Sequence, residues 1–276
     1  MAISPDRASV GRVRLRWAAT IVLTACALGA AAIWAPEGMA WRSEQARTLE
    51  VEVEAPAPVE PTRDATTKPT REATTEPTRE TALAEPGDVP ASGPGSFVGA
   101  LEGGPLLGAT GQLKQVRVAV EANLTAELDG LTAAVDAVLG DPRSWAAGGY
   151  RFQRVPYYAP HDFTIYLVTR ETAYSMCRVN GVDIRVDGVP YTSCRQVGQV
   201  IINLDRWRLS VPPYVDNDIP LKLYRAYVIN HEVGHELGRG HVGCPAPGRP
   251  APVMLPQTLG LQGCAPNSWP YPDGGN

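Results

Sequence analysis

The chain has 276 residues, with 25 Lys plus Arg against 29 Asp plus Glu, which gives a formal net charge of −4. A chain of this length holds one large domain or two small ones. The near balance of charge excludes a domain-wide basic surface, so we expect no nucleic-acid partner. The 26 Pro and 27 Gly are distributed unevenly, and they divide the chain into an N-terminal apolar region, a spacer and one domain.

An apolar segment at residues 17–35 contains no charged side chain and follows a basic segment, 1–16, with four Arg. A helix of that length spans about 28 Å, close to the thickness of a bilayer core. Because basic residues stay on the cytoplasmic side, we predict a single-pass signal anchor in the cell membrane, a cytoplasmic N-terminus and an extracytoplasmic remainder. Two alternatives stay open: a lipoprotein lipidated at Cys26, and secretion after signal cleavage near residues 38–40.

Residues 36–96 are rich in Pro, Thr, Ala and Glu and nearly lack large apolar side chains. They contain an eight-residue repeat, PTRDATTK at 61–68, PTREATTE at 69–76 and PTRETALA at 77–84. A polar repeat of this length cannot bury a core. We therefore predict a disordered stalk at 36–96, followed by one domain at 97–276.

From Phe97 onward, apolar periodicity predicts regular secondary structure. Alternating valines over 114–121 indicate a strand, and apolar residues at helical spacing indicate a helix over 124–139. Asp218 is expected to cap a second helix. The remaining expected elements are strands at 150–155, 163–168, 182–186 and 199–204, the second helix at 221–237, and only turns after it. This order predicts an α+β domain.

Four of the five cysteines lie in this domain: Cys177, Cys194, Cys244 and Cys264. An even number in an exported domain suggests disulfides, and four cysteines allow three pairings. We favour the sequence-local pairing, Cys177 with Cys194 and Cys244 with Cys264. The alternative of a cysteine-based zinc site is disfavoured because no CxxC pair occurs.

Three of the four His lie in one stretch, HEVGHELGRGH. Positions i and i+4 share one face of a helix, so His231 and His235 can bind one ion. Gly238 can end the helix by a turn that brings His241 back as a third ligand. Three His leave one position of a tetrahedral Zn2+ ion for water, and Glu232 is placed to act as general base. The motif predicts a catalytic zinc site; a structural zinc site is the alternative.

The signature HExxHxxGxxH followed by a Met-containing turn resembles that of the metzincin zinc peptidases. Every motif position is matched, and Met254 in PVMLP stands where these enzymes have the Met-turn. The resemblance implies a zincin domain with a small twisted mixed sheet, an active-site helix, and Met254 packed beneath the imidazoles. Pro256 departs from the pattern, since some metzincins have an oxyanion-stabilising Tyr there. Tyr214, Tyr224 and Arg239 are unranked candidates for that role.

A wider resemblance concerns residues 224–270 together with the segments DPRSW at 141–145 and NLDRW at 203–207. These stretches look similar to an uncharacterised family of exported metzincin-like proteins from actinobacteria. Metzincins usually have a helix after the Met-turn, whereas this chain has a short Pro- and Gly-rich tail. We expect an irregular tail, tied back by a disulfide between Cys244 and Cys264.

These features together predict a membrane-tethered, extracytoplasmic zinc peptidase, with Glu232 accepting the proton of the attacking water and delivering it to the leaving amine. The expected partner is a peptide or protein substrate that adds as a strand to the edge 199–204. Two alternatives stay open: a zinc amidase acting on cell-wall peptides, and a zinc-containing binding module of the cell envelope without turnover.

Overall fold

The computed structural model describes residues 81–85 and 87–275. The predicted cytoplasmic segment 1–16, the predicted anchor 17–35 and most of the predicted stalk lie outside these residues. Within the described part of the chain, none of the helices has the length and apolar character needed to cross a bilayer.

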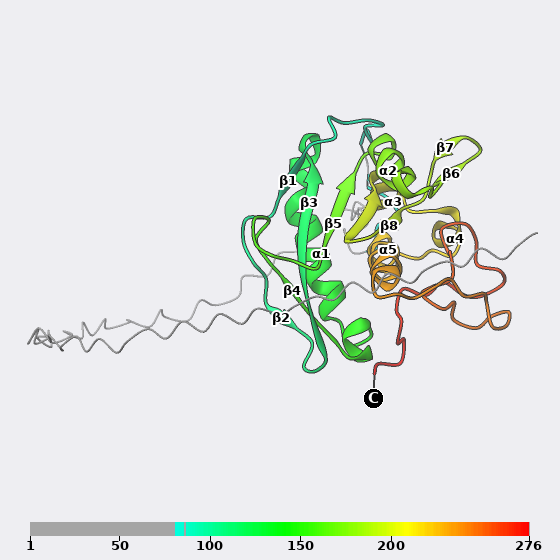
Figure 1. The fold of residues 1–276 in the computed structure, drawn as a ribbon. Coiled ribbons are helices and arrows are strands. Elements are labelled where there is room, and N and C mark those ends of the chain that lie inside the picture. Colours follow the sequence, from blue (N-terminus) through cyan, green and yellow to red (C-terminus); the bar gives the residue numbers. More distant parts are fainter. Residues whose placement is uncertain (1–80, 86, 276) are drawn as a thin grey trace, which may run out of the picture. The chain divides into compact units, whose positions relative to one another are not determined.

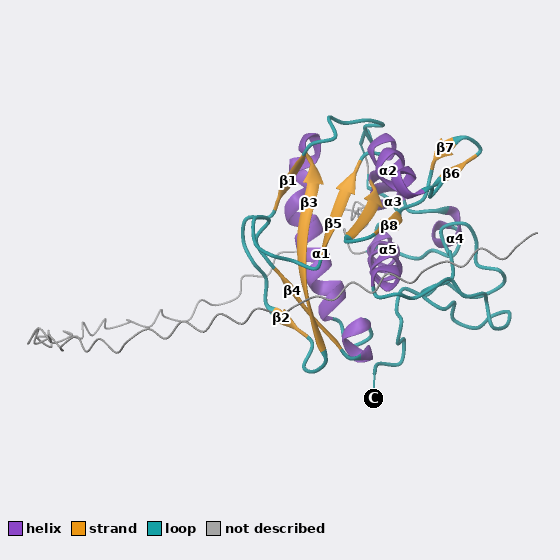
Figure 2. Ribbon diagram, viewed as in Figure 1, coloured by secondary structure: helices purple, strands orange, loops and turns teal. Residues whose placement is uncertain are grey.

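The domain is α+β, as the sequence predicts, and consists of helices packed on a mixed sheet (Figures 1 and 2). The strands are β1 (Phe97–Gly99), β2 (Leu106–Leu107), β3 (Gln112–Glu121), β4 (Tyr150–Arg154), β5 (Phe163–Val168), β6 (Arg185–Val186), β7 (Val189–Pro190), β8 (Cys194–Gln196) and β9 (Gln199–Asn203). The α-helices are α1 (Leu128–Gly140), α2 (Arg170–Cys177), α3 (Leu204–Leu209), α4 (Pro212–Val215) and α5 (Leu221–Glu236). Short 3-10 helices are η1 (Ala122–Glu127), η2 (Trp145–Gly148) and η3 (Arg178–Asn180).

The main sheet has the strand order β2-β4-β3-β5-β9-β8, with β1 paired antiparallel to β3. The pairs β4–β3, β3–β5 and β5–β9 are parallel, whereas β2 and β8 pair antiparallel with their neighbours. The sheet is therefore mixed, with antiparallel strands at both ends. Strands β6 and β7 form a separate hairpin.

Side chains of the central strands alternate between two hydrophobic layers. In β3, Val116, Val118 and Val120 belong to the cluster formed with α1 and α5, while Ala119 belongs to the cluster formed with α2. Strands β5 and β9 alternate in the same way. Because successive residues of a strand point to opposite faces, this pattern places helices on both faces of the sheet. Helix α5 packs on β9 and β8, which brings its C-terminal half to the β8 end of the sheet.

Most of the predicted elements are found, and one predicted cap is wrong. Strands occur within 112–121, 150–154, 163–168 and 199–203, and α5 covers most of 221–237. The helix expected from 124 begins as η1 and becomes α-helical at Leu128. Asp218 does not cap α5, because it lies in a left-handed turn (φ 54°) and Pro220 precedes the first helical residue. After α5, residues 237–275 contain only turns and one isolated bridge, as expected.

The segment before Phe97, which the sequence predicts to be part of the stalk, runs along the domain. The carbonyl of Ala82 accepts the first N–H of α5, from Leu221, at 2.8 Å. The carboxylate of Glu85 pairs with Arg225 on α5 at 2.9 Å. Residue 95 is held through its N–H by the buried carboxylate of Glu121 at 2.8 Å. The ordered contacts of the domain therefore begin before residue 97, the predicted start of the domain.

Candidate metal centre

Helix α5 carries the first two predicted ligands near its C-terminal end. His231 and Glu232 are buried and His235 is half-buried. The helix ends in a Schellman turn: Gly238 has φ 82°, its N–H donates to the carbonyl of His235 at 3.0 Å, and the next N–H donates to the carbonyl of residue 234 at 2.8 Å. The turn reverses the chain and brings His241 back to the helix. Gly238 therefore has the backbone conformation that the motif predicts.

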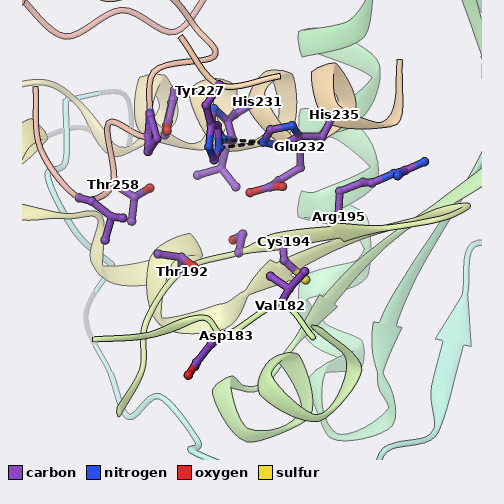
Figure 3. Close-up of a pocket in the computed structure, with 15 residues that line it drawn as sticks. Val182, Asp183, Thr192, Cys194, Arg195, Tyr227, His231, Glu232, His235 and Thr258 are labelled. Atoms are coloured by element: carbon purple, nitrogen blue, oxygen red, sulfur yellow. Dashed lines mark hydrogen bonds between the residues drawn. The ribbon is translucent and has the colours of Figure 1, made fainter. Parts of the chain in front are cut away.

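The Nε2 atoms of the three His converge on one point. Figure 3 labels two of these residues, His231 and His235. The Nε2 atoms lie 3.2 Å apart for His231 and His235, 3.0 Å for His235 and His241, and 3.3 Å for His231 and His241. Nitrogens bound to a tetrahedral ion at about 2.0 to 2.1 Å are separated by about 3.3 to 3.4 Å. The spacing of the triad is close to that value.

Backbone carbonyls determine the tautomers of two of these imidazoles. The Nδ1 atom of His231 lies 2.8 Å from the carbonyl oxygen of Val253, and that of His235 lies 2.8 Å from the carbonyl oxygen of Arg239. A carbonyl only accepts, so each Nδ1 must carry the proton and each Nε2 presents a lone pair. Lone pairs that face one another repel unless a cation lies between them. The triad therefore has the donor set and the orientation of a metal site.

Burial favours the neutral imidazole that a metal requires. It lowers the pKa of His231 to about 3, with smaller contributions from the neighbouring His235 and His241. Burial also lowers the pKa of His235 and of His241. All three side chains are thus available as ligands at neutral pH.

Glu232 is buried beside the triad and lines the same cavity. Its Oε2 atom is buried and has no hydrogen-bond partner among the described residues. Burial raises the pKa of Glu232 to about 8, whereas a cation at the triad favours the charged carboxylate. A buried carboxyl with a free oxygen is costly for stability alone, so its position fits a chemical role better than a structural one.

The Met-containing turn contacts the helix between the first two ligands. A Cβ atom added to Gly234 would lie 2.4 Å from the Sδ atom of Met254 and 2.7 Å from the ring of Trp145. The N–H of Val242 donates to the carbonyl of Met254 at 3.2 Å, and the carbonyl of Val253 binds His231. This turn therefore supports both the helix and the loop that carry the triad.

A cavity of about 460 Å³ adjoins the triad. It is lined by His231, Glu232 and His235 on α5, by His241 in the loop after the helix, and by residues 192–195 at the start of β8. Val182, Asp183 and residues 256, 258 and 259 after the Met-turn complete the lining. Figure 3 shows Glu232 pointing from the helix toward the β8 side of this cavity. The triad thus lies on the wall of a cleft large enough for part of a peptide.

Residues 83–266 match the model of a family described as a protein of unknown function (DUF3152). The chain belongs to the DUF3152 family. The match covers the whole sheet, α5, the three His and Glu232. No curated protein and no solved structure matches the chain.

The DUF3152 domain holds two disulfides, Cys177–Cys194 and Cys244–Cys264, in the pairing that the sequence favoured. The first ties the end of α2 to β8. The second closes the loop that contains Met254. Cys194 itself lines the cavity.

Two expectations about the cleft are wrong. The strand at 199–204 is not an edge, because β9 lies between β5 and β8, and β8 is the strand that lines the cavity. None of the candidate oxyanion-stabilising residues lines the cavity. The hydroxyl of Tyr214 donates to Gln257, that of Tyr224 bonds to Thr258, and Arg239 lies over the ring of Trp145.

One contact that the sequence does not predict is the hydrogen-bonded link from Tyr227 on α5 to the backbone after Met254, called here the Tyr227 clamp. The hydroxyl of Tyr227 donates to the carbonyl of Leu255 at 3.0 Å and accepts from the N–H of Gln257 at 2.8 Å. The ring centroid of Tyr227 lies 5.3 Å from that of His231. A signal was present, since Tyr227 precedes His231 by four residues and therefore shares its face of the helix. The partner segment could not be inferred because it lies far along the chain.

Proposed function

We propose that this DUF3152 domain is a zinc-dependent peptidase that hydrolyses an amide bond with an activated water molecule. The proposal rests on the convergence of three imidazole Nε2 atoms beside the buried carboxyl group of Glu232. Zinc is the divalent ion that best suits three imidazoles at near-tetrahedral spacing. Three protein ligands leave one coordination position for water or substrate, which is typical of catalytic rather than structural zinc.

When bound, the ion supplies a Lewis acid and lowers the pKa of water toward neutrality. The side chains of the domain supply the proton transfer and the orientation. Glu232 accepts the proton of the attacking water and delivers it to the leaving amine. The carbonyls of Val253 and Arg239 hold His231 and His235 in the ligating tautomer, which spares their reorientation during turnover.

Strand β8 supports binding of an extended peptide. It pairs with β9 on one side, and within the described sheet it has no strand on the other. Its residues Cys194 and Arg195 line the cavity that contains Glu232. An extended peptide that adds to this edge would run past the triad with its backbone N–H and C=O groups paired.

We further propose that the domain works outside the cytoplasm on a membrane tether. The apolar segment 17–35 supports this location, as do the two disulfides, which persist in oxidising compartments. Digestion of intact cells by an external protease tests it, because an extracytoplasmic domain is cleaved from the membrane fraction and a cytoplasmic one is protected.

Replacement of Glu232 by Gln tests the proposed reaction. The variant keeps the shape of the side chain and the three ligands, so we expect bound zinc at the wild-type level. Hydrolysis of a library of internally quenched peptides should fall by 100-fold or more, in line with the usual contribution of a general base of about 10² to 10⁴. His235→Ala is the matched variant that should lose both metal and hydrolysis. Unchanged hydrolysis in Glu232→Gln would refute the role of Glu232.

A further inference from the structure

Two disulfide-closed loops contribute to the lining of the cleft. The loop between Cys177 and Cys194 contributes Val182, and the loop between Cys244 and Cys264 contributes Leu259. Both aliphatic side chains are exposed, Val182 to 38% and Leu259 to 61%. Figure 3 shows Val182 on the β8 side of the cavity, across from α5. An aliphatic group on each loop therefore borders the cavity that holds the triad.

The charged groups that line this cavity, apart from the triad and Glu232, already have partners in the protein. Besides the triad and Glu232, the lining contains one cation, Arg195, and one further anion, Asp183. The Nε atom of Arg195 donates to Glu236 at 2.5 Å, and Asp183 is paired with Arg185 at 2.8 Å. Apart from the imidazoles, the cavity therefore offers no unpaired basic side chain to a substrate carboxylate.

This distribution separates two classes of amide substrate. Peptides rich in free carboxylate and amine groups, such as the cross-bridges of a cell wall, require charged partners when they leave water. A protein segment with an aliphatic side chain requires only apolar surface, and burial of one such side chain strengthens binding by about 10- to 100-fold. The lining of the cleft fits the second class.

We infer that the cleft takes an extended protein segment with an aliphatic side chain beside the cleaved bond, in contact with the aliphatic lining residues Val182 and Leu259. The inference rests on the proposed peptidase function and specifies its substrate class. The covalently closed loops keep the two aliphatic groups in place while the peptide pairs with β8. A peptide with an acidic side chain at this position binds more weakly.

The test measures binding separately from hydrolysis. The whole chain carrying Glu232→Gln is loaded with zinc, and fluorescence anisotropy follows three labelled peptides that differ only in a central Leu, Glu or Lys. We expect the Leu peptide to bind about 10- to 100-fold tighter than the other two. Leu259→Glu and Val182→Asp should each remove most of this preference. Val197→Asp is the matched control, because Val197 is 79% exposed, lies beside β8 and does not line the cavity.

Equal binding of the three peptides, tighter binding of the Glu peptide, or no measurable binding of any of them would overturn the inference. So would a Leu preference that survives Leu259→Glu and Val182→Asp. Failure of the peptidase proposal gives a different result. In that case the wild-type protein cleaves none of the peptides, while the Glu232→Gln protein still binds the Leu peptide more tightly than the Glu and Lys peptides.

Discussion

Tyr227→Phe tests how the Met-turn orients the metal ligands. The change removes one hydroxyl and keeps the ring against His231. It leaves the carbonyl of Leu255 and the N–H of Gln257 without this partner, and both residues are fully buried. The carbonyl of Leu255 and the N–H of Gln257 keep their mutual hydrogen bond of 2.7 Å, so each bond lost to the hydroxyl costs only its net value of about 0.5 to 1.5 kcal/mol. We therefore expect the free energy of unfolding to fall by about 1 to 3 kcal/mol for the two bonds.

The same change should weaken metal binding, because Leu255 lies two residues after Val253, whose carbonyl fixes the tautomer of His231. Loss of a group that orients a metal ligand typically reduces affinity about 10- to 100-fold. Zinc affinity is measured by competition with a chromophoric chelator. The electronic spectrum of the Co2+-substituted protein reports the coordination geometry independently of stability, and we expect its bands to shift.

Tyr224→Phe is the matched control. Tyr224 lies on the same helix and is also fully buried, but its hydroxyl bonds to the side chain of Thr258 and not to the backbone that carries Met254. It should lower stability without changing zinc affinity or the Co2+ spectrum. If Tyr227→Phe also destabilised the protein but left zinc affinity and the spectrum at their wild-type values, Tyr227 would only fill space.

Three further predictions concern packing, acid stability and the second disulfide. Gly234→Ala should lower the free energy of unfolding by about 1 to 3 kcal/mol, because the added methyl group meets the sulfur of Met254 at 2.4 Å. Gly130→Ala in α1 is the control: nothing lies within 4 Å of the added methyl group, so the free energy of unfolding should rise by about 0.5 to 1 kcal/mol. Urea titrations of the two variants measure both changes. Burial raises the pKa of Glu121, but its hydrogen bonds to Thr172, Thr169 and Gly95 together outweigh burial and hold the pKa below its ordinary value of 4.5. The stability that Glu121 contributes is therefore complete above pH 4.5 and is lost as the pH falls through the lower pKa of the folded state. The urea midpoint of Glu121→Gln should depend less on pH below 4.5 than the urea midpoint of the wild-type protein. Replacing Cys244 and Cys264 by Ser should lower the free energy of unfolding by about 3 kcal/mol, the value for a sequence separation of 20 residues. Zinc binding should also weaken, because the loop that this disulfide closes contains the Met-turn. An unchanged zinc affinity in the chelator titration would contradict that expectation.

The metal ligands could be found from sequence because their geometry is local. His231 and His235 are one helical turn apart, and Gly238 ends the helix so that His241 follows within three residues. The positions of these residues are therefore set by helix geometry and one turn. The disulfide pairing could be predicted from the sequence for the same reason, because each bridge closes a short loop.

Features set by contacts between distant segments could not be found in this way. The cap of α5 is the carbonyl of Ala82, which lies far from Asp218 in sequence and carries no capping side chain. Strand β8 has only three residues, Cys194–Gln196, too few for an alternating pattern, so the sequence alone predicts β9 as the edge of the sheet. The Tyr227 clamp likewise depends on the path of a turn without regular structure.

The central claim is tested most directly by the metal content of the purified whole chain, measured beside His235→Ala after both have been dialysed against equimolar zinc. We predict about one zinc per wild-type chain and a loss of most of it in the variant, with both proteins folded by circular dichroism. A folded wild-type protein without zinc, or equal zinc in the two proteins, would contradict the assignment of the His231, His235 and His241 triad as a metal centre.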